Sequence, residues 1–156
     1  MSPPLKPGHY LIQSVATGKY IGRNSKEDRS LRPKPVLQLP DSVDPHPWIV
    51  EKLPDGDSYI LRARGAPTAA VDGDVYAILL DVPLPEFWKI SSPERNPNDE
   101  YIIETNNRTR GWAVPGDEDF IKIAVRPLIV GPSFPPFYPP NQVFKFIPVE
   151  RDDASE

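Results

Sequence analysis

Cysteine is absent from this sequence, and histidine occurs only twice among its 156 residues. Without cysteine the chain has no disulfide framework, no thiolate metal site and no cysteine nucleophile. His9 and His46 lie far apart in the sequence, and no serine is surrounded by the residues of a nucleophile elbow. The sequence therefore predicts no Ser–His hydrolysis, no histidine-based metal site and no bound cofactor.

Grouped carboxylates are the remaining candidates for catalysis. They are Glu27/Asp28, Asp55/Asp57 and Asp117-Glu118-Asp119. All of them fall in polar turns or loops, where an ionised side chain stays hydrated and its pKa has little reason to shift. Asp72-Gly73-Asp74 lacks the remaining positions of a calcium loop and is expected to form a turn. These patterns indicate a protein that is not an enzyme.

Long hydrophobic runs are also missing. No stretch of about 18 apolar residues occurs, and residues 1–9 lack an apolar signal segment, so we expect a cytoplasmic protein without a membrane span. The net charge is −4 and the isoelectric point is near 5.2. This charge disfavours a nucleic-acid partner, because a nucleic-acid-binding surface needs basic residues that displace counterions.

Proline, in contrast, is abundant, with 22 residues. So many prolines exclude long helices, and the apolar runs between them are short, rich in β-branched and aromatic residues, and bounded by turn residues. The pattern predicts an all-β domain of twelve short strands. We expect them at residues 10–13, 19–22, 36–39, 48–52, 59–62, 69–71, 77–80, 87–90, 101–104, 111–114, 121–125 and 143–147.

The expected strands fall into three groups of four that begin and end alike. Threefold repetition with a period of roughly 40 to 50 residues predicts a β-trefoil, in which the first and fourth strands of each repeat line a barrel. The aromatic residues of these strands are therefore expected in the core. They are Tyr10, Tyr59 and Tyr101 in the first strands, and Trp48, Trp88 and Phe144 in the fourth. One domain is predicted, with repeats at about 8–53, 57–92 and 99–149 and a disordered tail at 150–156.

A polar segment from Lys19 to Val36 stands out from this pattern. Its centre reads Glu27-Asp28-Arg29-Ser30-Leu31, and Pro33 and Pro35 follow. The two prolines hold φ at about −65° and keep the residues before them out of the helical region, so the outgoing arm should be extended and stiff. A stiff, extended loop that carries a basic residue has the shape that trypsin-like proteases bind. The same composition is also typical of an ordinary solvated loop.

Several short motifs occur in a fixed order from about Gly8 to Pro148. They are Gly18-Lys19-Tyr20-Ile21-Gly22-Arg23, Glu27-Asp28-Arg29-Ser30-Leu31, Pro33-Lys34, Trp48-Ile49-Val50-Glu51, Gly111-Trp112 and Pro127-Leu128-Ile129. Together they resemble the mushroom β-trefoil serine protease inhibitors, the cospin-like family. In that family the loop between the second and third strands enters the active site of trypsin and presents an arginine as the primary specificity residue.

The resemblance implies a monomeric, reversible, tight-binding inhibitor of trypsin-like serine proteases. Its protease-binding loop would comprise Glu27, Asp28, Arg29, Ser30 and Leu31, with Arg29–Ser30 as the reactive bond. Arg23, Lys26 and Arg32 are the alternatives to Arg29 as the specificity residue. The acids before Arg29 are disfavoured by some trypsin-like enzymes, or they bond to Arg23, Arg32 or backbone amides and hold the loop in shape.

Two other functions fit the sequence. A β-trefoil lectin would use Trp112 near Asn106 and Asn107 as its sugar platform. Inhibition of an asparagine-specific cysteine protease would use the loop that contains the same two asparagines. The segment Gly131–Asn141, with Phe134, Phe137 and Tyr138, is either an aromatic contact surface or a connector that caps the barrel.

Overall fold

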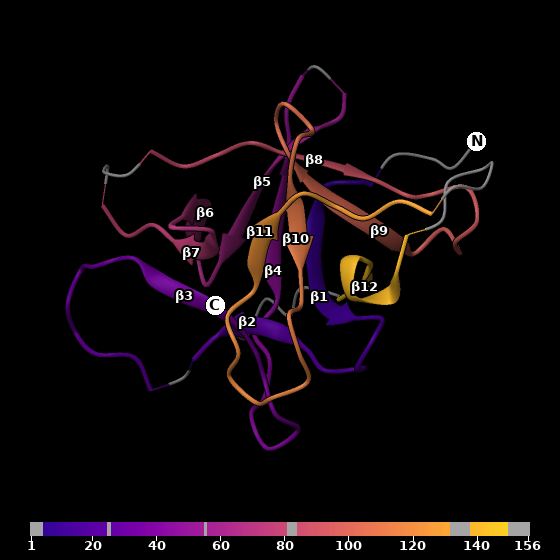
Figure 1. The fold of residues 1–156 in the computed structure, drawn as a ribbon. Helices are drawn as coiled ribbons and strands as arrows, with labels where there is room; N and C mark the ends of the chain where they lie inside the picture. Colours follow the sequence, from indigo (N-terminus) through magenta and orange to yellow (C-terminus); the bar gives the residue numbers. More distant parts are fainter. Residues whose placement is uncertain (1–4, 25, 55, 81–83, 132–137, 150–156) are drawn as a thin grey trace.

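The computed structural model describes residues 5–24, 26–54, 56–80, 84–131 and 138–149 (Figure 1). Within these ranges the chain forms twelve β-strands and one short 3-10 turn, so the predicted all-β class is confirmed. No helix in the described ranges is long and apolar enough to cross a membrane. The strands are β1 (Gly8–Ser14), β2 (Ile21–Arg23), β3 (Lys34–Gln38), β4 (Trp48–Lys52), β5 (Ser58–Ala63), β6 (Ala66–Val71), β7 (Asp74–Ala77), β8 (Trp88–Ser91), β9 (Glu100–Thr105), β10 (Gly111–Ala113), β11 (Ala124–Arg126) and β12 (Phe144–Pro148), and the 3-10 turn is η1 (Pro140–Gln142).

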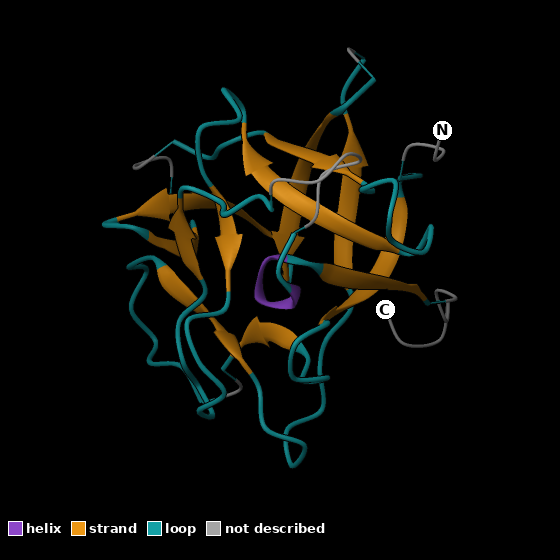
Figure 2. Ribbon diagram, turned by 45° about the vertical axis from the view of Figure 1, so that its right-hand side comes forward, coloured by secondary structure: helices purple, strands orange, loops and turns teal. Residues whose placement is uncertain are grey.

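Six strands pair in a closed antiparallel ring. β1 pairs with β4 and β12, β5 pairs with β4 and β8, and β9 pairs with β8 and β12. The other six form the hairpins β2–β3, β6–β7 and β10–β11. Figure 2 shows the strands enclosing a common centre. Because the ring closes on itself, these strands form a continuous wall with no free edge, and the loops start from a fixed frame.

The core is aromatic, as the sequence predicts. The six residues expected there are all buried: Tyr10, Trp48, Tyr59, Trp88, Tyr101 and Phe144 are 0–9 % exposed. Trp112 of β10 joins them, with its ring centroid 5.5 Å from that of Trp88 and 5.8 Å from that of Trp48. Large aromatic rings that meet edge to face contribute more than their buried area alone. This cluster holds the fold without any disulfide.

The residues of β1 show why these segments form strands. Tyr10, Ile12 and Ser14 are buried, whereas the residues between them are only partly so. This period of two matches the alternation of side chains across a pleated strand. The same alternation decides below which side of β3 faces inward.

β7 spans Asp74–Ala77, three residues earlier than predicted. Asp72 and Gly73 have φ of 52° and 83°, so they form a two-residue hairpin turn. β7 therefore begins directly after this turn, with Asp74 opposite Val71. β11 is also displaced, to Ala124–Arg126, because residues 121–123 bond to β3: the Gln38 amide donates to the Ile121 carbonyl at 2.9 Å. Asp55 and the predicted disordered tail at 150–156 lie outside the described residues.

Gly111 is the glycine that the packing of the barrel requires. A Cβ atom at this position would lie 2.7 Å from the Ile103 carbonyl oxygen and 2.8 Å from Leu128 Cδ1. Gly111→Ala should therefore lower the free energy of unfolding by about 1–3 kcal/mol, measured by urea denaturation, because the core has no room for the methyl group. Gly116→Ala is the control, since the atoms nearest to its Cβ belong to the flexible end of Glu118. Equal stability of the two variants would contradict this account.

Candidate functional site

The loop between β2 and β3 projects from one side of the barrel (Figure 1). Its incoming end is fixed where Arg23 pairs with Val36 across the β2–β3 hairpin. Its outgoing end is fixed by a different strand, because Lys34 and Pro35 pair with Ala77 and Tyr76 of β7. Both ends of the loop are therefore held by strands, and none of the described residues between these ends pairs with a strand.

The incoming arm is held by an ion pair. The Arg23 guanidinium donates from Nε to Glu27 Oε2 at 2.9 Å and from Nη2 to Glu27 Oε1 at 2.6 Å. It also donates from Nη1 to the Ala63 carbonyl oxygen at 3.1 Å, which ties the arm to the end of β5. The two side chains are only 9 % and 11 % exposed, and a shielded bidentate pair of this kind is strong and directional. Arg64 adds a bond from Nη1 to the Asn24 carbonyl oxygen at 3.3 Å.

The outgoing arm is held by Lys34, whose side chain is 6 % exposed. Its ammonium group forms an ion pair with Asp28 Oδ1 and also donates to the Asp28 carbonyl oxygen at 3.3 Å and to Ser30 Oγ at 3.1 Å. An ammonium group has three donors, and all three are used here within the loop. Asp28, Ser30 and Lys34 are called the loop clamp below.

Asp28 also shapes the turn around Arg29. Its Oδ1 accepts the backbone N–H of Ser30 at 3.0 Å and the Ser30 hydroxyl at 2.6 Å. This side-chain bond to the residue two positions on forms an Asx turn with Arg29 at its centre. The hydrogen bond from Lys34, followed by those from the Ser30 hydroxyl and amide, holds the pKa of the Asp28 carboxyl well below its usual range. The carboxylate therefore stays ionised, which is the form that the turn needs.

Arg29 itself is exposed to solvent. Its side chain makes no hydrogen bond or ion pair with any part of the chain that the structure describes. Leu31, two residues further on, is 59 % exposed. The structure thus brings Glu27, Asp28 and Ser30 of the predicted loop into bonds with the scaffold, and it leaves Arg29 and Leu31 projecting.

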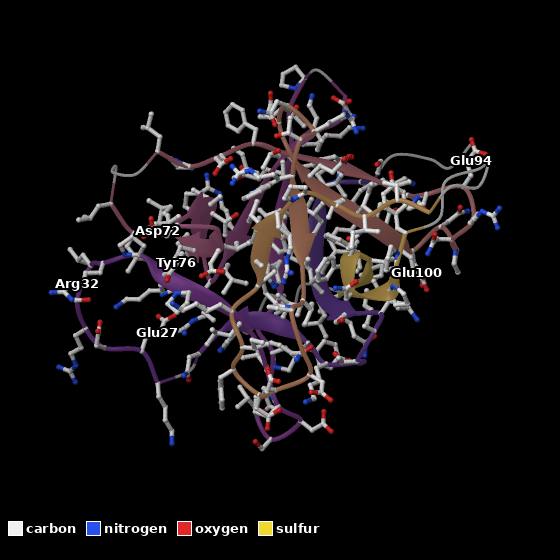
Figure 3. All side chains as sticks on the ribbon, in the orientation of Figure 1. Glu27, Arg32, Asp72, Tyr76, Glu94 and Glu100 are labelled. Carbon is white, nitrogen blue, oxygen red and sulfur yellow. The ribbon has the colours of Figure 1, made fainter. Side chains whose placement is uncertain are left out.

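The alternative basic residues are placed differently. Arg23 is enclosed by its bonds to Glu27 and Ala63, so its guanidinium is not available to a partner. Arg32 is exposed and lies at the outer edge of the loop, as Figure 3 shows. Lys26 is also exposed, and its backbone N–H donates to Asn24 Oδ1 at 2.9 Å.

Two of these contacts were expected from the sequence, but the central one was not. The expected bond between Glu27 and Arg23 is confirmed, and Asp28 does bind a backbone amide. Its charged partner, however, is Lys34, which was not among the expected partners Arg23, Arg32 and backbone amides. A signal was available: Lys34 stands two residues before Val36, so the two share one face of β3, and that face is buried.

The predicted sugar platform is wrong. Trp112 is 0 % exposed and its ring packs against Trp48, Trp88 and Phe144, so no sugar can stack on it. The reason is that all three residues of β10 are buried, because the strand is enclosed rather than half-exposed. Asn106 and Asn107 do lie in an exposed loop. The use of that loop against a cysteine protease stays a prediction.

The aromatic segment Gly131–Asn141 is described only at its ends. Tyr138 is partly buried, and this burial raises the pKa of its phenol. Phe134 and Phe137 lie outside the described residues.

Comparison with known proteins defines the class of protein to which this loop and barrel belong. A family model described as peptidase inhibitor I66 matches residues 1–148, so the chain belongs to this family of peptidase inhibitors. The resemblance found in the sequence is thereby confirmed, and membership indicates an inhibitor rather than an enzyme.

Individual relatives agree with this assignment. A serine protease inhibitor of Lentinula edodes is 42 % identical over 147 residues, which are 94 % of this chain and 99 % of the relative. A solved proteinase inhibitor from Coprinopsis cinerea matches with a TM-score of 0.86 and 37 % identity over 93 % of this chain and 99 % of the other. ThreeFoil, a designed threefold-symmetric protein, shares the fold alone, with a TM-score of 0.67 and 18 % identity over 91 % of this chain and 99 % of its own.

The contacts of the loop clamp lead to a prediction for the pKa of the Asp28 carboxyl group. The fold stabilises the ionised form of Asp28, so its folded pKa lies below the usual aspartate value of about 3.9. The stabilisation of the loop by Asp28 should therefore be complete above a pH of about 3.9, and it should be lost only as the pH falls through the lower folded pKa. In Lys34→Met the Asp28 pKa should rise towards about 3.9, since the largest cause of the shift is removed. NMR titration of the carboxyl carbons measures both values. An Asp28 pKa that is unchanged in Lys34→Met would contradict the clamp.

Proposed function

We propose that this protein inhibits trypsin-like serine proteases by inserting Arg29 into the specificity pocket, with the Arg29–Ser30 bond beside the catalytic serine. The observation that carries the proposal is the contrast between Arg29 and its neighbours. Arg29 is exposed and has no bond to the described part of its own chain, whereas Asp28 and Ser30 on either side are fixed. A free guanidinium can form a bidentate, charge-assisted pair with a carboxylate at the base of a pocket.

The fixed neighbours support tight binding. A loop that must be ordered on contact loses affinity, whereas a loop already held in shape does not. Here the Arg23–Glu27 pair holds the incoming arm and the loop clamp holds the outgoing arm. Pro33 and Pro35 restrict the backbone that follows. These contacts do by side-chain bonding what disulfides do in many small inhibitors.

The loop clamp should also make cleavage of the Arg29–Ser30 bond slow and reversible. Asp28 and Lys34 lie on opposite sides of the Arg29–Ser30 bond, so their ion pair survives hydrolysis of that bond. Hydrolysis adds one water and leaves a carboxylate on Arg29 and an amine on Ser30. That nitrogen already lies 3.0 Å from Asp28 Oδ1, and as an ammonium it binds the carboxylate more strongly. The amine is thus retained beside the carboxyl group of Arg29, where loss of water can reform the bond.

The other basic residues suit the role less well. Arg23 is already bound. Cleavage after Lys26 would require Glu27 to act as the leaving-group residue, although its carboxylate is held by Arg23 and is 11 % exposed. Arg32 precedes Pro33, whose nitrogen carries no hydrogen and whose ring constrains the preceding residue. Arg29 is therefore the residue on which the proposal rests.

We further infer that the barrel is a β-trefoil of three four-strand repeats. The ring built from the first and fourth strands of each group supports this inference, as does the pairing of the second and third strands in each group. The likeness to a designed threefold-symmetric protein points the same way. In such a fold the β2–β3 loop can vary in sequence without disturbing the ring.

Arg29→Ala tests the proposal directly. Loss of the charged anchor should raise the inhibition constant for trypsin by at least about a hundredfold, because a single buried charged residue can dominate such an interface. Arg29→Lys should retain most of the inhibition. Arg32→Ala is the matched control and should stay within about threefold of the wild type. Unchanged potency of Arg29→Ala would remove Arg29 from the role.

Asp28→Ala tests whether the loop clamp protects the Arg29–Ser30 bond from cleavage. With Arg29 intact but the turn unsupported, trypsin should still bind at first and then cleave Arg29–Ser30, so that inhibition fades with time. We expect roughly tenfold weaker binding and faster appearance of the cleaved chain, followed by mass spectrometry. Lys26→Met removes an exposed lysine of the same loop and should behave like the wild type. A long-lived, uncleaved complex of Asp28→Ala would show that the clamp is dispensable.

A further inference from the structure

A second loop leaves the barrel beside the β2–β3 loop. β3 begins at Lys34, directly opposite Ala77, the last residue of β7. The residues that follow Arg29 therefore lead into β3 next to the point where the β7–β8 loop departs. Figure 1 shows the described parts of these two loops on the same side of the molecule.

The described part of the β7–β8 loop presents large apolar side chains to solvent. Leu80 is 54 % exposed and Leu84 is 77 % exposed, and Leu31 on the neighbouring loop is 59 % exposed. A single exposed leucine needs no explanation. Leu31 shortly precedes β3 and Leu80 shortly follows β7, so exposed leucines stand on two loops that are joined to paired strands, which makes them a candidate interaction surface.

The base of the β7–β8 loop is fixed by backbone bonds. The Ile78 amide donates to the Pro67 carbonyl oxygen at 2.7 Å, and the Glu86 amide donates to the Thr68 carbonyl oxygen at 2.9 Å. The Glu86 carboxylate in turn accepts the Ala70 amide at 2.6 Å. Both ends of the loop are thus held on β6, so Leu80 and Leu84 are attached to a rigid base.

The size of a protease–inhibitor interface requires more than one loop. Such interfaces use about 20–30 residues a side and bury about 800 Å² per partner. The chain between β2 and β3 has only the ten residues 24–33, and several of them face the scaffold. A protease bound at Arg29 must therefore contact a further segment, and the β7–β8 loop is the neighbour on the side of the residues that follow the reactive bond.

We propose that Leu80 and Leu84 form a second contact with the same protease molecule, against an apolar patch beside the part of its cleft that binds the residues after the cleaved bond. This inference rests on the proposed function. The pocket contact of Arg29 decides which class of protease is bound, and the leucine contact distinguishes among members of that class. Partners that lack an apolar patch at this place are bound less tightly.

The double variant Leu80→Ala/Leu84→Ala tests the second contact. Its inhibition constant for the protease should rise about ten- to hundredfold, and the increase should appear in the dissociation rate. Ile129→Ala/Val130→Ala is the matched control, because these residues are also exposed, at 68 % and 48 %, but follow β11 rather than β7. Both double variants should unfold at the wild-type urea concentration, since all four side chains are exposed.

Three results would overturn this inference. In the first, Leu80→Ala/Leu84→Ala inhibits as well as the wild type, whereas Arg29→Ala has lost inhibition. This result contradicts the second contact but not the proposed function. The second is an equal loss of potency in the Ile129→Ala/Val130→Ala control. The third is a wild-type dimer in sedimentation velocity that Leu80→Ala/Leu84→Ala makes monomeric, which assigns the leucines to a second copy of this chain. Unchanged potency of Arg29→Ala would instead defeat the proposed function by itself.

Discussion

The conformation of the β2–β3 loop depends on the ammonium group of Lys34. β3 turns this side chain inward, so the charge loses most of its water and must be paired and hydrogen-bonded. The acceptors that satisfy it all come from Asp28 and Ser30. Any conformation that moves these residues away leaves a poorly hydrated charge without partners. The described residues around Arg29 are therefore favoured in the conformation that keeps these bonds.

That constraint acts only because the strand beneath it cannot move. β3 is paired with β2 on one side and with β7 on the other, and its Gln38 and Val36 also bond to the segment before β11. The hairpins stand on a ring of six strands filled by aromatic side chains. A chain without cysteine thus gains its rigidity in two stages, first by packing in the barrel and then by ion pairing in the loop.

The fold could be predicted from the sequence because its signals are local and repeated. Three tyrosine strands and three aromatic closing strands specify the ring, and β4 was predicted at its observed bounds. The candidate site could be predicted from the sequence only in part. Arg29 and its exposed loop follow from composition and resemblance, but the bond between Asp28 and Lys34 depends on which face of β3 is buried. The burial of Trp112 was also not predicted, because all three residues of β10 are enclosed and so short a strand shows no alternation of buried and exposed positions.

The separation between the clamp and Arg29 makes position 29 exchangeable. Since the backbone turn is specified by Asp28, Ser30 and Lys34, and the Arg29 side chain bonds to none of them, the residue at the apex can change without altering the loop that carries it. If Arg29 enters the specificity pocket as proposed, a tyrosine or leucine there would redirect the same scaffold towards proteases with apolar pockets. Under that proposal few substitutions would suffice to change the target protease, because the side chain at position 29 makes no bond with the described part of the fold.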